Sequence, residues 1–181
     1  GGMVGACLAA LASANRHFAD LRIAVLEAQP PSIPPPETPG DVDLRVSAIS
    51  RASERILTEI GAWPLIAPRH RSSYEDMIVW DAAGQARGPG SIHFAASESG
   101  EPNLGHIVEN RRVLWAIYDS PAFRRRVTLL RGELAGLEFD DEQATAILTD
   151  GRRIEAGLIV GSDGSGSVSR KLAGIETDGW D

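Results

Sequence analysis

The chain opens with Gly1-Gly2-Met3-Val4-Gly5, which runs directly into the alanine-rich segment 6–12. Gly2 and Gly5 fit the second and third glycines of the dinucleotide-binding pattern G-x-G-x-x-G. Residues 22–27, Arg-Ile-Ala-Val-Leu-Glu, follow about twenty positions later and are typical of a buried strand that ends in an acid. Glycine turn, helix, strand and acid together predict the βαβ unit of an α/β, Rossmann-like fold.

Each residue type in this unit has a chemical reason. Gly2 would let the backbone approach a pyrophosphate, and Gly5 would let the helix pack closely on the strands. Backbone amides at the helix start, helped by the helix dipole, favour the phosphate charge. Glu27 falls where a carboxylate accepts hydrogen bonds from a ribose 2′-hydroxyl, so the site should prefer FAD or NAD over NADP. A lone glycine pattern is a weak signal, but the strand and the acid at the expected spacing favour the nucleotide site.

Composition limits the classes of function. The chain has 181 residues, 43% of them hydrophobic, and a formal net charge of −7, which argues against nucleic acid as a partner. Cys7 is the single cysteine, so no disulfide can form within the chain, and this suits a cytoplasmic location. No apolar stretch approaches the length of a membrane span. The four histidines show no metal-ligand spacing, no Ser-His-acid set is recognisable, and we assign neither a metal site nor a catalytic residue.

Residue patterns further along predict a mixed order of elements. We expect a helix over 4–18, an extended proline-rich loop over 30–40, and a helix that Ser50 caps and Gly61 ends. Later elements are predicted as a helix over 111–119 and as strands over 74–80, 91–95, 104–108, 127–130, 133–139, 144–149, 153–154 and 158–160.

A second motif follows the last of these strands, in residues 158–170, Leu-Ile-Val-Gly-Ser-Asp-Gly-Ser-Gly-Ser-Val-Ser-Arg. Asp163 and Gly164 would lie at the carboxyl end of a buried strand, where open α/β sheets bind ligands. Taken alone, Asp163 is better interpreted as a turn residue or as a cap of the helix that holds Arg170.

These segments together resemble a known family. The stretches GGMVG, RIAVLE, LRVSAISRASERILTEIGAW, LGHIVENRRVLWAIYDS and LIVGSDGSGSVSRKLAGI are similar to the flavin-dependent hydroxylases of ubiquinone biosynthesis. These VisC/UbiH-type enzymes belong to the para-hydroxybenzoate-hydroxylase-like group A FAD monooxygenases. The resemblance implies a Rossmann-like FAD-binding domain with a β-rich insertion: 1–63 and 109–181 would form the FAD-binding part, and 64–108 the start of the substrate domain.

The resemblance also implies residue roles. Gly2, Gly5 and Glu27 match the adenosine and pyrophosphate site of FAD, and Arg45 matches an arginine that reaches the FAD phosphates. A surface arginine near a helix start is the simpler interpretation of Arg45.

Two further pairs match family positions. Glu109 and Asn110 fall where the wider group has a Gln-Arg pair near FAD, and Asn110 lacks the arginine charge. Asp163 and Gly164 match a motif associated with FAD and with NADPH during flavin reduction.

The implied activity is hydroxylation of a polyprenylated phenol ring with NAD(P)H and O₂. Another flavoprotein on the same scaffold, an oxidase or a prenyl reductase, is one alternative, and a non-catalytic nucleotide-binding module is another. The family's first sheet strand and a third motif are missing from the sequence, so we expect a piece of a longer polypeptide that binds FAD weakly by itself and tends to form oligomers. A location peripheral to the inner membrane and association with a biosynthetic complex stay open.

Overall fold

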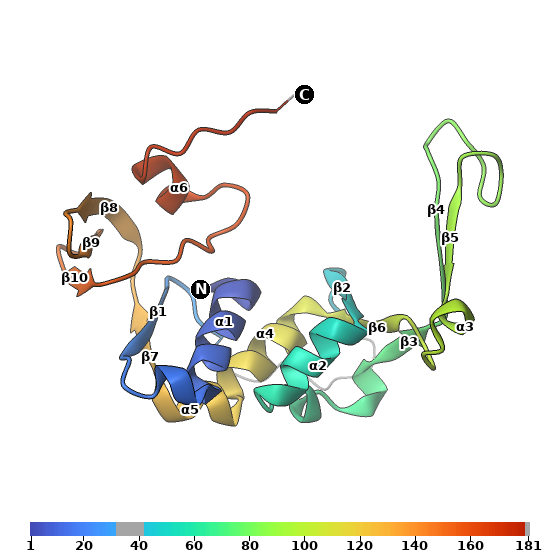
Figure 1. The fold of residues 1–181 in the computed structure, drawn as a ribbon, viewed down its shortest axis with the longest axis horizontal. Helices are drawn as coiled ribbons and strands as arrows, with labels where there is room; N and C mark the ends of the chain where they lie inside the picture. Colours follow the sequence, from blue (N-terminus) through green and yellow to red (C-terminus); the bar gives the residue numbers. More distant parts are fainter. Residues whose placement is uncertain (32–41, 180–181) are drawn as a thin grey trace.

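The computed structural model describes residues 1–31 and 42–179 (Figure 1). Most of the expected proline-rich loop therefore lies outside the described residues. The helices are α1 Gly2–Ala14, α2 Arg51–Glu59, α3 Ala96–Ser99, α4 Asn110–Asp119, α5 Pro121–Arg126 and α6 Val168–Leu172. Short 3-10 turns are η1 Arg16–Phe18, η2 Trp63–Leu65 and η3 Pro68–His70. The strands are β1 Ile23–Glu27, β2 Val46–Ser50, β3 Ser72–Tyr74, β4 Asp76–Val79, β5 Ile92–Ala95, β6 Gly105–Glu109, β7 Val127–Arg131, β8 Leu134–Phe139, β9 Ala144–Leu148 and β10 Arg153–Ala156.

The nucleotide-binding part is built on a parallel strand pair. β1 and β7 run side by side in register, Val25 opposite Leu129 and Glu27 opposite Arg131. Helix α1 precedes β1 and packs against it, as a βαβ-type unit requires. The strand expected within residues 22–27 is thus confirmed and begins one residue later, at Ile23, and the expected helix over 4–18 ends earlier, at Ala14.

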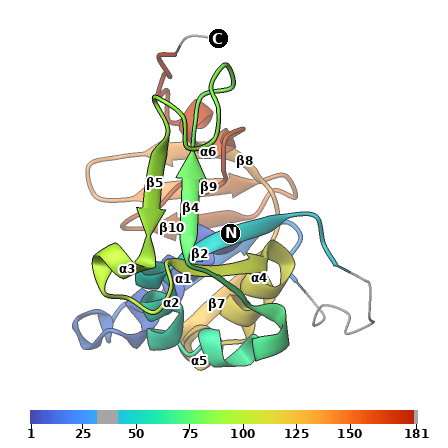
Figure 2. The ribbon, with the colours of Figure 1, turned by 90° about the vertical axis from the view of Figure 1, so that its right-hand side faces the viewer.

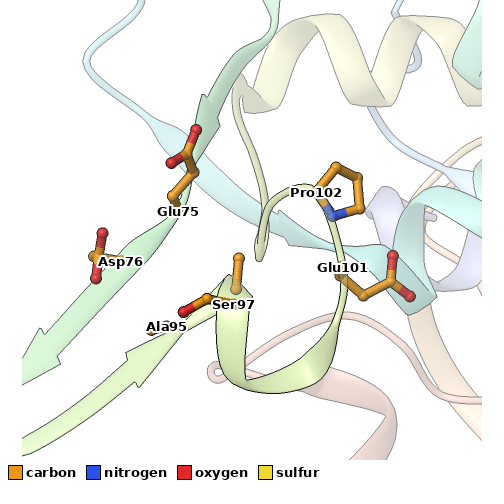
Figure 3. Close-up of a pocket in the computed structure, with 7 residues that line it drawn as sticks. Glu75, Asp76, Ala95, Ser97, Glu101 and Pro102 are labelled. Carbon is orange, nitrogen blue, oxygen red and sulfur yellow. The ribbon is translucent and has the colours of Figure 1, made fainter.

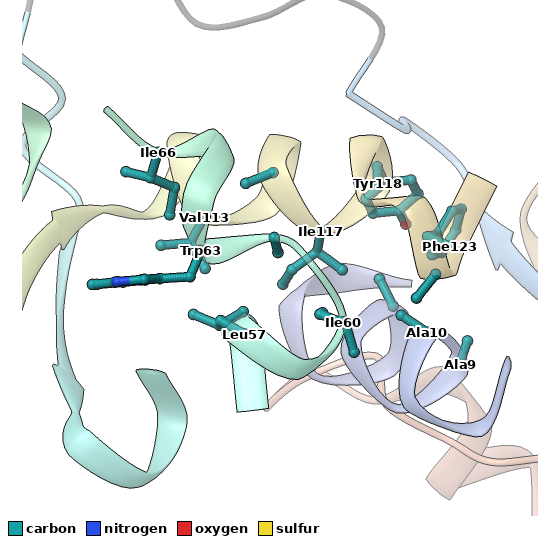
Figure 4. Close-up of a cluster of buried hydrophobic side chains, with 14 of the residues drawn as sticks. Ala9, Ala10, Leu57, Ile60, Trp63, Ile66, Val113, Ile117, Tyr118 and Phe123 are labelled. Carbon is teal, nitrogen blue, oxygen red and sulfur yellow. The ribbon is translucent and has the colours of Figure 1, made fainter. Parts of the chain in front are cut away.

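The core lies between helices rather than on the strand pair (Figure 4). Small side chains on α1, Ala6, Ala9 and Ala10, let the helix come close to α4 and α5, where Ile117 and Phe123 are buried. Leu57, Ile60, Trp63 and Ile66 extend this core across α2 and η2. Burial of these apolar side chains is the main stabilising contribution to the fold.

A second sheet has the order β2–β6–β3, with both pairs antiparallel. Ser50 ends β2 and caps α2, its side chain accepting a hydrogen bond from the Ser53 amide, and Gly61 follows the helix with a positive φ. Both helix signals are confirmed. Strand β2 was not predicted from the sequence. This strand, which lies before the predicted insertion over 64–108, pairs with β6 in a sheet that also contains β3.

A two-stranded ribbon, β4–β5, projects beyond α3 and stands clear of the other helices in Figure 1, and Figure 2 shows it face-on. The strand expected over 74–80 is divided between β3 and β4. A turn follows β4, with the Gly84 amide bonded to the Asp81 carbonyl.

At the other end of the molecule lies an antiparallel meander in the order β10–β9–β8 (Figure 1). Its three strands match those predicted over 133–139, 144–149 and 153–154. A turn at Gly151, whose amide bonds the Leu148 carbonyl, joins β9 to β10.

The prediction of a buried strand over 158–160 was wrong. These residues form no strand, and Leu158 and Val160 are 78% and 55% exposed. Among the described residues no strand runs alongside them, so their backbone has no ladder to join and their apolar side chains have no sheet to cover.

No helix within residues 1–31 and 42–179 combines the length and the apolar character needed to cross a membrane.

Candidate cofactor site

The glycine turn and Glu27 lie against each other in the structure. The Glu27 carboxylate accepts the Gly2 amide at 2.9 Å, and the N-terminal amine of Gly1 bonds the Leu26 carbonyl at 2.9 Å. A Cβ at Gly1 would overlap the Glu27 carboxylate, and Gly2 has φ +70°, a conformation that favours glycine. The acid at the end of β1 is therefore held directly over the start of α1.

The second motif also reaches the glycine turn, although it forms no strand. A Cβ at Gly5 would overlap the Ser162 hydroxyl, and this hydroxyl lies 3.5 Å from the Gly1 carbonyl. Gly5 thus allows a close approach, but in this structure the segment that approaches it is residues 161–163. The N-cap residue, Gly1, provides no side-chain cap, and the Glu27 carboxylate accepts only the first amide of α1, that of Gly2, so the amides that follow keep the character of an anion-binding helix end.

Asp163 bonds to the chain that follows it. Its carboxylate accepts the Ser167 hydroxyl at 2.5 Å, the Ser169 amide at 2.9 Å and the Ser169 hydroxyl at 2.7 Å. Burial opposes its ionisation, but these hydrogen bonds outweigh it and hold the Asp163 pKa well below its usual range. The contacts are those of a residue that fastens the start of α6, for which Ser167 is the N-cap. Gly164 has φ +84° and open space around it.

Arg45, Glu109 and Asn110 form a second group, built on the β2–β6 pair. The Asn110 amide donates to the Arg45 carbonyl at 2.9 Å, and the Asn110 side-chain oxygen accepts the Ser47 hydroxyl at 2.6 Å. The structure thus brings Arg45 next to the adjacent residues Glu109 and Asn110, which lie far from it in the sequence.

Glu109 is the electrostatic centre of this group. It is 7% exposed, and its carboxylate accepts the Asp43 amide at 2.9 Å and the Nε atoms of Arg111 and Arg112, both at 2.7 Å. Burial opposes its charge, but the bonds from Arg112, Asp43 and Arg111 prevail and lower the Glu109 pKa to about 2. Glu109 is therefore ionised and fully engaged with its own chain. The Arg45 side chain is exposed, and no carboxylate pairs with it among the described residues.

Nothing in the sequence marks Tyr118 as a functional residue. Its hydroxyl is buried without a hydrogen-bond partner among the described residues. Burial and the nearby Glu27 charge raise the Tyr118 pKa to about 12. In the sequence, Tyr118 lies on the apolar face of a predicted helix. Only the fold shows that the charge of Glu27 acts on its hydroxyl.

A pocket of about 240 Å³ lies elsewhere, between the ribbon and the β5–β6 connection (Figure 3). Glu75, Asp76 and Glu101 make it acidic, and Glu101 is bound by Arg51 and Arg55. None of the sequence-predicted site residues lines it. In the part of the chain that the structure describes, no cluster of histidine, cysteine or acidic residues could hold a metal ion.

Comparison with known proteins decides the relationship. Over 99% of its length the chain is 33% identical to 3-demethoxyubiquinol 3-hydroxylase of Escherichia coli, and 31% identical to the ubiquinone biosynthesis monooxygenase COQ6 of Rattus norvegicus. The chain is a homologue of the ubiquinone-biosynthesis monooxygenases. It spans 44% and 38% of the length of these two relatives. No protein-family model matches the chain.

Solved structures confirm the fold class. The anhydrotetracycline hydroxylase OxyS of Streptomyces rimosus superposes with a TM-score of 0.69 at 21% identity, over 99% of this chain and 33% of its own. The p-nitrophenol 4-monooxygenase PnpA of Pseudomonas putida gives 0.64 at 18% identity, over 96% and 42%. The chain thus has the Rossmann-like fold of these hydroxylases.

Residues present at the glycine turn fit an adenosine and pyrophosphate group. The space of a Cβ at Gly1 and at Gly5 is taken by Glu27 and Ser162, whereas a Cβ at Gly2 would have only the Ser162 carbonyl near it, at 3.9 Å. Gly2 is therefore the position at which a ligand can approach the backbone, and Glu27 occupies only the first amide of α1. The Glu27 carboxylate accepts two amides, from Gly2 and from Gln29 at 3.1 Å, which leaves lone pairs for ribose hydroxyls.

Proposed function

We propose that this chain supplies the adenosine half of the FAD site in a monooxygenase that hydroxylates a polyprenylated phenol ring in ubiquinone biosynthesis, with NAD(P)H as reductant. The observation that carries the proposal is the fixed geometry of Glu27 over the Gly2 amide at the start of α1. Sequence similarity to ubiquinone hydroxylases along nearly the whole chain supports the choice of substrate class.

Bound FAD would supply the chemistry that activates O₂, and the residues of this chain bind and orient it. Amides at the start of α1 would hold the pyrophosphate, and the Glu27 carboxylate would accept hydrogen bonds from the adenosine ribose. Arg45 would add a planar donor fork for a phosphate oxygen. We assign no proton transfer to any residue of this chain.

Binding of half-cofactors tests the assignment directly. The chain should bind ADP-ribose in calorimetric titration and bind FMN at least about tenfold more weakly, because the proposed contacts lie on the adenosine side. A phosphate on the 2′-hydroxyl should weaken ADP-ribose further, since Glu27 repels it. Equal affinities for FMN and ADP-ribose would contradict the proposal, as would tighter binding of the 2′-phosphorylated ligand.

Activity is tested in a relative, because the chain covers less than half of each. We would replace the matching 44% of the E. coli hydroxylase with this chain and express the chimaera in a strain lacking the enzyme. Restored ubiquinone formation, measured by chromatography of lipid extracts, would support the ring hydroxylase. A chimaera that carries FAD yet forms no hydroxylated product would favour another flavoprotein function.

A different flavoprotein activity on the same scaffold is the second candidate function, and one comparison supports it. A solved Diels-Alderase, PyrE3, superposes with a TM-score of 0.63 at 18% identity, so the fold alone does not select monooxygenation. We also propose that the protein is located in the cytoplasm. Cell fractionation of the tagged protein tests this location.

A further inference from the structure

One end of the molecule carries a cluster of positive charge. Residues 15–22, which follow α1, and residues 119–126, which contain α5, together hold five arginines and two aspartates. These segments therefore carry a net charge of +3, with His17 neutral, whereas the chain as a whole carries −7. The charged members of this cationic surface are Arg16, Asp20, Arg22, Asp119, Arg124, Arg125 and Arg126.

Arg126 fastens the two segments together. Its guanidinium donates to the Ser13 and Phe18 carbonyls at 3.0 Å, and also to the carbonyls of Ala19 and Leu21 at 2.5 and 3.3 Å. α1 and α5 also pack closely, so the loop after α1 is held against α5 (Figure 1). The two segments are therefore held together by the hydrogen bonds of Arg126 and by the packing of α1 on α5.

Most of the remaining charge on this surface is open to a ligand. Arg16, Arg22 and Arg125 are exposed, and no acidic side chain pairs with them among the described residues. Arg124 pairs with Asp119 at 2.9 Å. On the neighbouring helix α2, Glu59 is the last residue, and Gly61, just beyond it, lies against Pro121 at the start of α5.

Two apolar side chains lie among these arginines. Phe18 and Leu21 are 43% and 57% exposed on the loop that Arg126 holds. Arginine beside exposed aromatic and aliphatic groups is the composition of surfaces that lie at a lipid headgroup boundary. Burial of the two side chains there would add an apolar contribution to the electrostatic one.

We propose that this cationic surface binds anionic lipid headgroups, with Phe18 and Leu21 inserted at the level of the acyl boundary. Charge complementarity selects the occupant, because a chain with a net charge of −7 approaches an anionic surface only through its positive end. The exposed apolar pair favours a lipid surface over an acidic protein or free phosphate, which would leave Phe18 and Leu21 in water. The surface is formed by other residues than the glycine turn, so the proposal does not rest on the proposed function.

Vesicle cosedimentation of the 181-residue chain tests the proposal. It should bind phosphatidylcholine vesicles that contain about a third phosphatidylglycerol, and not pure phosphatidylcholine. Raising the ionic strength from about 0.05 to 0.5 M should release it. Equal binding to both kinds of vesicle, or none to either, would overturn the proposal.

Matched variants locate the surface. Arg22→Glu with Arg125→Glu should weaken binding at least about 30-fold, each basic residue near the membrane being worth about fivefold. Arg87→Glu with Lys171→Glu changes the net charge equally on exposed positions of other elements and should change binding less than about threefold. Equal loss in both pairs would show a general charge effect and refute the assignment of the surface.

A second measurement covers a failure of the charge variant to fold. Phe18→Ser with Leu21→Ser keeps every charge and should weaken vesicle binding about tenfold or more while leaving retention on a polyglutamate column unchanged. Unchanged vesicle binding would exclude insertion. Retention on polyglutamate without vesicle binding would show that the surface serves an acidic protein instead.

Discussion

The replacement Glu109→Gln separates a structural role from a cofactor role. Glu109 is 7% exposed and accepts hydrogen bonds from Asp43, Arg111 and Arg112. The fall of its pKa from 4.5 to about 2 in the folded state corresponds to about 3 kcal/mol, at about 1.4 kcal/mol per pH unit. Because the glutamine keeps the shape but not the charge, we expect a loss of about 2–3 kcal/mol in the free energy of unfolding at pH 7.

Urea denaturation between pH 7 and 3 measures the size of this loss of stability and the direction in which it changes with pH. A carboxylate whose pKa is lowered on folding stabilises the protein above its unfolded pKa, near 4.5, and loses this contribution as the pH falls toward 2. The difference between wild type and Glu109→Gln should therefore be constant from pH 7 to about 5.5 and shrink below about 4.5. Glu138→Gln is the matched control, because Glu138 pairs with Arg153 on the surface, and it should cost under about 1 kcal/mol.

The reasoning fails if Glu109→Gln is as stable as the wild type, or if the difference between them does not change below pH 4.5. Normal stability with weakened binding of ADP-ribose would instead place Glu109 at the cofactor, the role that the family resemblance implies.

Three further substitutions test the glycine turn and the second motif. Glu27→Ala should weaken ADP-ribose binding by about 1–3 kcal/mol in calorimetry, the size of a charge-assisted hydrogen bond, and unchanged affinity would remove Glu27 from the site. Gly5→Ala should lower the unfolding free energy by about 1–3 kcal/mol, with partial rescue by Ser162→Gly, whereas Gly157→Ala, in open space, should cost little. Asp163→Ala removes three hydrogen bonds and should cost about 1–3 kcal/mol in thermal unfolding, and normal stability with weaker ligand binding would favour a cofactor role.

Local signals predicted the parts of the fold that local chemistry decides. The Ser50 cap and the end of α2 at Gly61 depend on residues within a few positions, and both are present. The same holds for β1, whose run of apolar residues ends in Glu27.

Features that depend on distant partners were missed or wrong. An apolar run such as 158–160 becomes a strand only beside another strand, and none lies there among the described residues. β2 escaped notice because its serines break the apolar pattern, yet the register with β6 supplies its partner. Residue identity alone also did not reveal that Glu109 would be engaged by its neighbours Arg111 and Arg112.

The second group is best understood as a device that holds Arg45. Glu109 accepts the Asp43 amide, the Asp43 carboxylate accepts the Arg45 amide at 2.9 Å, and Asn110 bonds the Arg45 carbonyl. The backbone around Arg45 is therefore fixed on both sides while its guanidinium stays exposed. A side chain that is already saturated has little capacity left for a ligand, whereas a fixed, exposed guanidinium can bind a phosphate with little loss of backbone entropy. Of the three residues in this group, Arg45 is thus the one whose removal should weaken an anionic ligand directly, and Glu109 and Asn110 act through its position.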